Sequence, residues 1–170
     1  IIRASAVNND GNDKVGYMAP SVSGQVNAME TALAYADIEP QDISYIEAHG
    51  TGTEIGDPIE YKALMSVFGE CKKESISLDL QNETISPIAN FNKPNTKIDY
   101  SNSPFKFNKK LTKWDGNTKK RIAAISSFGI GGTNAQVILE ESTYNLDKKN
   151  IGNIGAAENP EYFIPVSAKT

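Results

Sequence analysis

The sequence has few of the cysteine and histidine residues that metal-binding, redox-active and disulfide-linked proteins depend on. Its 170 residues include one cysteine, one histidine and one tryptophan. A single cysteine forms neither a disulfide framework within the chain nor a multi-cysteine metal site. Cys71 stands beside Lys72 and Lys73, outside any motif, and is interpreted as a bystander thiol rather than a nucleophile. We therefore expect no bound metal.

Long apolar runs and an excess of positive charge are also absent. No stretch is long enough to span a bilayer, and no N-terminal signal peptide is recognisable. The net charge of −4 shows no excess of basic residues of the kind that binds nucleic acid. We expect a cytoplasmic protein that binds neither membrane nor nucleic acid. Because the sequence begins Ile1-Ile2-Arg3 rather than with methionine, we expect a fragment of a longer protein.

The polar groups most suited to chemistry gather around the only histidine. His49 ends a short apolar run, 45–48, that predicts a buried strand. Thr51 and Thr53 follow it, alternating with glycines. Glycine lets the backbone approach a ligand closely, and each threonine hydroxyl both donates and accepts hydrogen bonds. This stretch is therefore predicted to aim side chains into a cleft.

A helix is predicted directly after this loop. Asp57 is the expected N-cap, Pro58 the first helical residue, and Glu60 the capping-box residue. Capping alone would account for both carboxylates. The predicted helix runs to Phe68, and Gly69 closes it.

The rest of the pattern predicts a mixture of strands and helices. A strand over 1–8 ends in a turn at 8–11, and apolar residues at helical spacing over 22–36 predict a helix capped by Ser21 or Ser23 and stopped at Glu39-Pro40. Two apolar runs, 121–127 and 135–140, predict an antiparallel strand pair joined by a turn at 129–134. Between 70 and 108 the periodicity is lost, and a structureless connection of that length is unusual inside one domain.

Three motifs resemble those of beta-ketoacyl synthases, in particular the ketosynthase domains of modular polyketide synthases. They are HGTGTEIGDPIE at 49–60, SSFGIGGTNA at 126–135 and SAVNNDG at 5–11. Their order and spacing agree with the second half of a ketosynthase, so the resemblance covers nearly the whole chain. It implies the C-terminal half of a thiolase-like, layered α/β/α fold, with a mixed sheet sandwiched between helices.

The resemblance also implies what this chain lacks. The nucleophilic cysteine of the family lies in the N-terminal half. A second-histidine segment, with its strand and the helix after it, is expected between stretches like 74–78 and 84–95, and is predicted to be missing near 77–80. Residues 1–141 would then be the ketosynthase half. Residues 142–170, rich in Asn, Lys and Gly at their start, would be a linker toward a following acyltransferase or linker domain.

The reaction implied by the resemblance is a decarboxylative Claisen condensation of an acyl thioester with malonyl carrier protein. His49 would stabilise the thioester oxyanion and assist decarboxylation, while Thr51 and Thr53 would hydrogen-bond the phosphopantetheine arm. The alternative for the threonines is simple turn stabilisation. No cofactor is expected to bind directly, since phosphopantetheine is carried by the acyl carrier protein. That carrier, the N-terminal ketosynthase half and a second copy in a homodimer are the expected partners.

The glycine-rich turn is implied to be a gate over the nucleophile. It consists of Phe128, Gly129, Ile130, Gly131 and Gly132, and a tight hairpin is the simpler alternative. The turn lacks the third glycine of a dinucleotide loop, and a strand is predicted after it, so NAD binding is rejected.

Asp57, Glu60 and Asn134 are interpreted as structural residues. In the family, the glutamate pairs with a lysine of the second-histidine motif, so without that motif Glu60 is expected to face solvent. Two further hypotheses remain open for the chain as a whole. In the first, the chain is a non-catalytic truncated ketosynthase that serves as a structural or carrier-docking module. In the second, it is one part of a split enzyme completed by a second chain.

Overall fold

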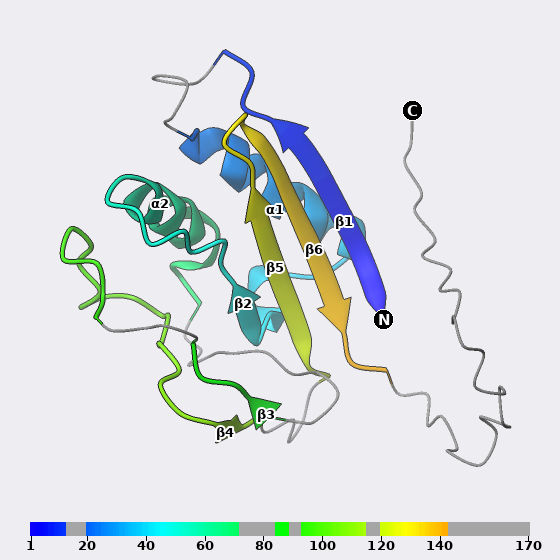
Figure 1. The fold of residues 1–170 in the computed structure, drawn as a ribbon. Helices are drawn as coiled ribbons and strands as arrows, with labels where there is room; N and C mark the ends of the chain where they lie inside the picture. Colours follow the sequence, from blue (N-terminus) through cyan, green and yellow to red (C-terminus); the bar gives the residue numbers. More distant parts are fainter. Residues whose placement is uncertain (13–19, 72–83, 89–92, 115–119, 143–170) are drawn as a thin grey trace, which may run out of the picture.

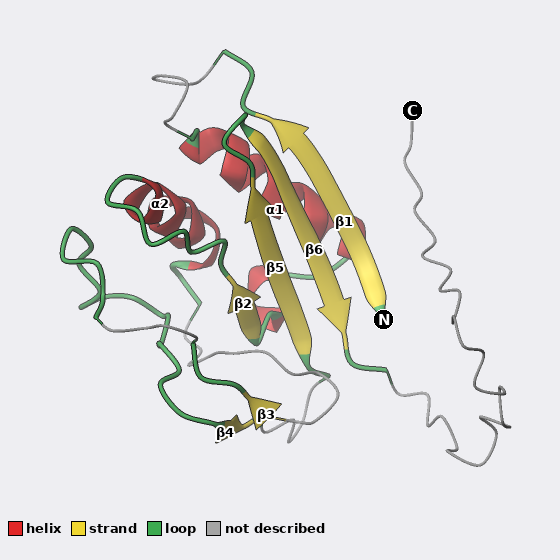
Figure 2. Ribbon diagram, viewed as in Figure 1, coloured by secondary structure: helices red, strands yellow, loops and turns green. Residues whose placement is uncertain are grey.

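The chain folds as a mixed sheet with two α-helices, as seen in a computed structural model that describes residues 1–12, 20–71, 84–88, 93–114 and 120–142 (Figures 1 and 2). Neither α-helix in this part of the chain is long and apolar enough to cross a membrane. In chain order the elements are β1 (Ile2–Asn9), α1 (Val22–Ala36), the 3-10 helix η1 (Pro40–Asp42), β2 (Tyr45–Glu47), α2 (Gly56–Phe68), β3 (Thr84–Ile85), β4 (Thr112–Lys113), β5 (Ile122–Phe128) and β6 (Thr133–Glu140).

The main sheet has the strand order β1-β6-β5-β2. β1 and β5 both run antiparallel to β6, which lies between them, and β2 runs parallel to β5. The antiparallel pair expected near residues 121–140 is therefore confirmed as β5 and β6. The two ends of the described chain meet in this sheet, because the amino group of Ile1 donates to the carbonyl of Glu140 at 2.8 Å. β3 and β4 form a separate two-stranded ladder.

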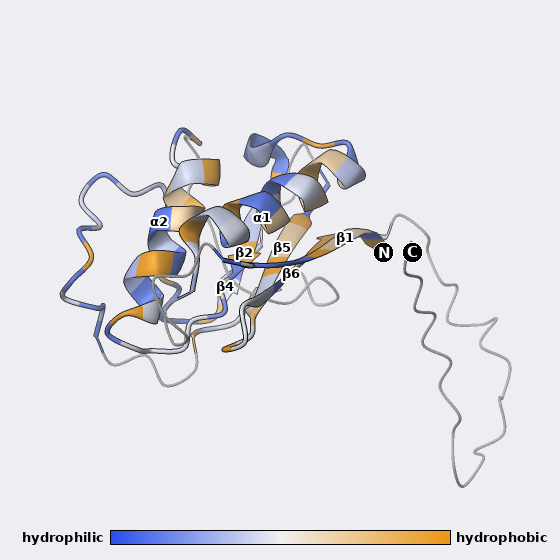
Figure 3. Cartoon of the chain, turned by 90° about the horizontal axis from the view of Figure 1, so that it is seen from above, coloured by the Kyte–Doolittle hydropathy of each residue, from blue (hydrophilic) through white to orange (hydrophobic). Residues whose placement is uncertain are grey.

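Both helices pack on the same face of the main sheet, as the view along the sheet in Figure 3 shows. Alternate strand residues such as Ala6, Ala124 and Ile138 meet Met29 of α1 and Leu64 of α2 in one apolar core. The expected α/β class is confirmed. It takes the form of a mixed sheet packed by helices, and within the described residues α1 and α2 both lie on one face of that sheet.

The opposite face of the sheet is only partly covered. At one end, Trp114 packs edge-on against Tyr45 with ring centroids 5.8 Å apart, and Ile85 and Ala123 complete this second apolar cluster. Farther along the strands, no described helix lies on this face, and Val7 of β1 is 69% exposed. A sheet face left open in this way is a surface that another layer of structure can cover.

Helix α1 begins and ends with clear caps. The Ser21 hydroxyl accepts from the Gly24 N–H at 3.2 Å, so Ser21 rather than Ser23 is the N-cap. The helix ends at Ala36 because Asp37 takes a left-handed conformation with φ of 52°. The sequence predicts the end of this helix at Glu39-Pro40, whereas α1 ends three residues before Glu39. Pro40 instead begins η1.

Candidate active site

His49 lies just beyond the end of β2, beside the hairpin that joins β5 and β6. Because β2 pairs in parallel with β5, with Glu47 opposite Ile125, the residues after β2 emerge next to the end of β5. The His49 ring meets the Phe128 ring edge-on with centroids 6.0 Å apart. The imidazole itself is exposed, and it lies at the margin of a cavity. The sheet thus brings together two of the predicted site segments.

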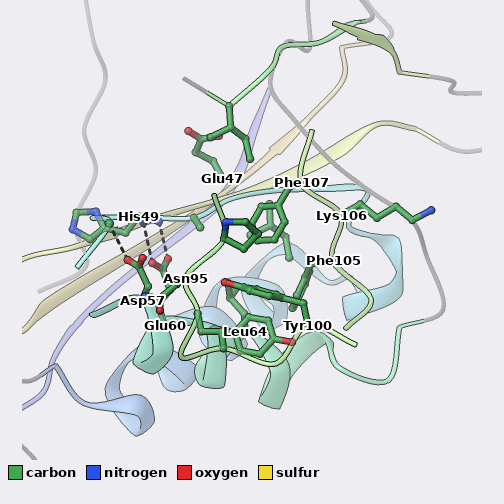
Figure 4. Close-up of a pocket in the computed structure, with 18 of the residues that line it drawn as sticks. Glu47, His49, Asp57, Glu60, Leu64, Asn95, Tyr100, Phe105, Lys106 and Phe107 are labelled. Atoms are coloured by element: carbon green, nitrogen blue, oxygen red, sulfur yellow. Dashed lines mark hydrogen bonds between the residues drawn. The ribbon is translucent and has the colours of Figure 1, made fainter. Parts of the chain in front are cut away.

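Glu60 holds the backbone of the histidine loop in place. One carboxylate oxygen accepts from the His49 N–H at 2.7 Å, and the other accepts from the Gly50 N–H at 2.9 Å (Figure 4). Glu60 is 5% exposed. The expectations that it serves in a capping box or faces solvent are therefore wrong, because the two backbone donors solvate the carboxylate inside the protein. Burial raises the pKa of Glu60, while the two N–H groups oppose that rise.

The start of α2 also differs from the prediction. The helix begins at Gly56, and its N-cap, Ile55, has no capping side chain. The Thr53 hydroxyl accepts from the Gly56 N–H at 3.0 Å and so takes over that role. Asp57 lies inside the first turn and accepts from the Gly52 N–H at 2.9 Å. Asp57 and Glu60 therefore hydrogen-bond to the preceding loop rather than cap the helix end.

Thr51 and Thr53 lie side by side on the surface of this loop. Their hydroxyl oxygens are 3.0 Å apart and share a hydrogen bond. Both residues are exposed. Gly50 and Gly52 have φ values of 53° and 71°, a region that glycine adopts without strain, so the glycines allow the loop to turn and present both hydroxyls outward. A role toward a phosphopantetheine arm stays a prediction.

The predicted gate is a tight hairpin. The Gly129 N–H donates to the Thr133 carbonyl at 2.7 Å, and the Gly132 N–H donates to the Gly129 carbonyl at 2.8 Å. Phe128 is buried against the core, whereas Ile130 at the tip is 72% exposed. The gating role itself stays a prediction.

A buried polar cluster beneath this hairpin was missed by the sequence reasoning. The Asp10 carboxylate accepts from the Asn134 side-chain amide at 2.6 Å and from the Ser21 N–H at 3.1 Å. Asp10 is 5% exposed and Asn134 is 1% exposed. The sequence motif at 5–11 contains Asp10, but the turn chemistry of that motif accounts for an aspartate without any distant partner. The structure instead shows that Asp10 ties the end of β1, the start of α1 and the hairpin together.

A cavity of about 740 Å³ opens beside the histidine loop, and no feature of the sequence indicated it. β2 and the loop after it form one wall, α2 forms a second, and residues from the stretches 86–88 and 93–107 form the third. In Figure 4, the aromatic rings of Tyr100, Phe105 and Phe107 lie together on the side away from His49. The lining is mostly apolar.

Glu60→Gln is expected to lower the free energy of unfolding by about 1.5 kcal/mol, because the two carboxylate oxygens each accept from a backbone N–H and the glutamine amide would turn its own NH₂ toward one of those donors. Urea unfolding of the 170-residue chain would measure the change. Glu54→Gln is the matched control, since Glu54 is exposed and pairs only with Lys97 across the surface. Equal unfolding midpoints for the two variants would contradict this role.

The pH dependence of stability provides a second measurement. Because the pKa of Glu60 is raised on folding, the folded chain holds that proton more tightly than the unfolded chain. This contribution to stability is therefore largest below the ordinary pKa and declines as the pH rises through the raised value. Glu60→Gln should remove that part of the pH profile, whereas Glu54→Gln should keep it.

Two family descriptions match the chain in tandem. "Beta-ketoacyl synthase, C-terminal domain" matches residues 1–81, and "Ketoacyl-synthetase C-terminal extension" matches residues 94–170. The expected boundary at 141/142 is not tested by these matches, and residues 143–170 lie outside the described part of the structure. The segment near 77–80 also lies outside it, so its loss stays a prediction.

Curated relatives are polyketide synthases. The chain is 34% identical over 197 residues to polyketide synthase PksN of Bacillus subtilis, with 99% of this chain and 4% of the relative covered. It is 35% identical over 169 residues to a phenolphthiocerol/phthiocerol polyketide synthase of Mycobacterium tuberculosis, with 84% of this chain and 11% of the relative covered. The chain therefore spans a small part of each relative.

Solved ketosynthases share the fold. Ketosynthase twelve of the bacillaene polyketide synthase from Bacillus amyloliquefaciens is 38% identical with a TM-score of 0.76, over 83% of this chain and 30% of that chain. The ketosynthase from module 6 of the bacillaene synthase of Bacillus subtilis is 34% identical with a TM-score of 0.76, over 84% of this chain and 30% of that chain. The described sheet and helices thus match the layered fold of those domains.

Proposed function

Because the chain belongs to the beta-ketoacyl synthase family, we propose that it supplies the decarboxylating half of a condensation site. It comprises the C-terminal domain and the C-terminal extension of a ketosynthase homologous to those of polyketide synthases. The observation that carries the proposal is the position of His49. Its backbone is fixed by Glu60, and its ring lies against Phe128 at the margin of a cavity. A fixed donor at such a place can stabilise negative charge as it develops.

The proposed reaction joins two thioesters. A malonyl thioester loses CO₂, and the electron pair of the broken C–C bond forms an enolate whose oxygen receives a hydrogen bond from the imidazole of His49. The enolate carbon attacks an acyl group held on a cysteine, and the thiolate leaves when the tetrahedral adduct collapses. That cysteine belongs to the N-terminal half of the ketosynthase. Covalent catalysis divides the acyl transfer into two easier steps.

The two threonines serve the arm that carries the malonyl group. Amide groups of a phosphopantetheine arm need short hydrogen-bond partners at the mouth of the site, and the exposed hydroxyls of Thr51 and Thr53 fit that chemistry. The carrier protein that holds the arm is the proposed macromolecular partner. The sheet face that α1 and α2 leave open is the proposed docking surface for the N-terminal half, in a cytoplasmic homodimeric synthase.

A second candidate is a non-catalytic ketosynthase remnant. One observation favours it: the match to PksN runs over 197 residues, 27 more than this chain has, so the relative contains positions without a counterpart here. The proposed missing second-histidine segment is in keeping with such a gap. The intact geometry around His49 and Glu60 favours the catalytic proposal instead.

Replacing both Thr51 and Thr53 by valine in the complete synthase should raise the KM for malonyl carrier protein about thirtyfold, because each lost hydrogen bond is worth about 1 kcal/mol. Release of labelled CO₂ from malonyl carrier protein is the measurement, with kcat expected to change little. Serine at both positions should restore the wild-type KM, since it keeps the hydroxyls and the bond to the Gly56 N–H.

Thr112→Val serves as the control, because Thr112 lies on β4 away from the histidine loop and should leave the KM unchanged. A rise in KM of the same size in that control would reject the role given to the two loop threonines. A complete synthase that is acylated on its cysteine but never releases CO₂ would reject the proposed reaction itself and favour the remnant.

A further inference from the structure

Four aromatic residues in mutual contact line the cavity beside the histidine loop. The Tyr100 ring meets the Phe107 ring edge-on with centroids 5.0 Å apart, and it meets the Tyr61 ring edge-on at 5.1 Å. The Tyr61 ring also contacts the Phe105 ring, with centroids 6.2 Å apart. All four residues line the cavity, and Phe107 is 36% exposed. A partly uncovered row of rings offers contact area to an apolar or aromatic group.

The cavity lining also contains a carboxylate that the fold does not satisfy. Asp57 and Glu60 both accept from backbone N–H groups of the histidine loop. Glu47 of β2 is half-buried, and its carboxylate has no hydrogen bond or ion pair in the part of the chain that the structure describes. Burial raises the pKa of Glu47, and no donor or cation opposes that rise. A positively charged guest would supply the missing partner.

The lysines that line the cavity do not neutralise this carboxylate. In Figure 4, Glu47 lies on the opposite side of the cavity from Glu60, and the Lys106 side chain extends away from the cavity. Lys93 also belongs to the lining, but it is exposed. The space next to Glu47 therefore favours a cation, whereas the row of rings favours an apolar group.

The size of the cavity fits a small molecule. Its volume of about 740 Å³ lies within the range of roughly 300 to 1,000 Å³ that is usual for ligand pockets. Protein interiors seldom contain voids larger than a water molecule, so the space is not an ordinary packing defect. A mostly apolar wall with a few polar groups is also the usual composition of a ligand pocket.

We propose that this cavity binds a small organic ammonium ion, with its ammonium group at Glu47 and its apolar body against the rings of Tyr61 and Tyr100. The carboxylate accepts a charge-assisted hydrogen bond from an N–H of the amine. The rings remove the apolar body from water. The inference goes beyond the proposed condensation, because neither Glu47 nor these rings take part in that reaction.

Phenylbutylamine and phenylbutanol are the matched probes, because they share an apolar body and differ in the charged head group. NMR titration of each probe into the 170-residue chain should give saturable shifts of the ring signals of Tyr61 and Tyr100. The amine should bind about tenfold more tightly than the alcohol, since a charge-assisted hydrogen bond is roughly twice as strong as a neutral one.

Three substitutions separate the charge from the apolar wall. Glu47→Gln should lower the affinity for the amine about tenfold and leave the affinity for the alcohol unchanged. Tyr100→Leu should weaken both probes by the same factor, about threefold to tenfold, because it removes a ring that either probe contacts. Glu54→Gln is the matched control, since Glu54 lies outside the cavity lining and pairs with Lys97, and it should change neither affinity. Thermal unfolding checks that each variant folds.

Equal affinity of the wild-type chain for the amine and the alcohol would overturn the inference without any substitution. Absence of binding would do so as well, as would a Glu47→Gln variant that still prefers the amine. These results do not bear on CO₂ release by the complete synthase, so the proposed reaction is tested separately. Binding of the amine by a chain whose synthase releases no CO₂ would keep the inference and reject the reaction.

Discussion

A complete synthase carrying His49→Ala is expected to lose malonyl decarboxylation while its nucleophilic cysteine is still acylated. The imidazole is the donor proposed to meet the enolate oxygen, and removing one such donor lowers kcat by about 10²-fold to 10³-fold. Acylation should survive because the acyl group reaches the cysteine through the other half of the site. Mass spectrometry of the acyl-enzyme and release of labelled CO₂ measure the two steps on the same sample.

The fold should tolerate this substitution. Glu60 accepts from the backbone N–H of His49 rather than from its ring, so alanine keeps that hydrogen bond. The ring is exposed, and its described aromatic contact is with Phe128. Phe128→Leu is the companion control, because it removes the ring contact and keeps the imidazole donor. Decarboxylation at the wild-type rate in His49→Ala would refute the role proposed for the histidine.

Gly24→Ala is expected to destabilise the chain by about 3 kcal/mol, at the upper end of the usual cost of overpacking. Helix propensity alone predicts the opposite, since alanine in a helix is favoured over glycine by about 0.5 to 1 kcal/mol. A Cβ at Gly24, however, would lie 2.2 Å from an Asp10 carboxylate oxygen and 2.9 Å from the Asn134 amide nitrogen. The Asp10 carboxylate cannot move aside cheaply, because Asn134 and the Ser21 N–H both hold it.

Gly131→Ala is the matched control for this prediction. A Cβ built there meets nothing within 4 Å, and the residue does not have a positive φ. Urea unfolding should therefore show a much lower midpoint for Gly24→Ala and a nearly unchanged one for Gly131→Ala. A rise in stability for Gly24→Ala would mean that the cluster around Asp10 is loose and that helix propensity decides the outcome.

The elements that were predicted correctly depend on local signals. The period of α1, the apolar runs of β5 and β6, and the cap expected at Ser21 or Ser23 each involve residues close together in the sequence. The meeting of His49 with Phe128 was anticipated only through the family motifs, because nothing local joins residues 79 positions apart. The parallel pairing of β2 with β5 is the physical reason that they meet.

The features that were missed depend on contacts between distant residues. Asp10 looks like a turn residue until Asn134, 124 positions later, is seen to donate to it. Glu60 has the spacing of a capping box, and only the path of the loop after β2 shows that it binds the His49 and Gly50 N–H groups instead. The cavity has no signal in the sequence, because residues within 45–64 form its walls together with residues from 86–88 and 93–107, which come later along the chain.

The pairing of the first strand with the last constrains how this chain matures during synthesis. β1 has its only described strand neighbour in β6, and Ile2 lies opposite Leu139. At about 5 to 20 residues per second, the ribosome needs on the order of ten seconds to synthesise β6 after it has synthesised the residues of β1. Until then α1 can form locally but has no complete sheet to pack on, so the nascent chain exposes apolar surface to chaperones throughout that interval.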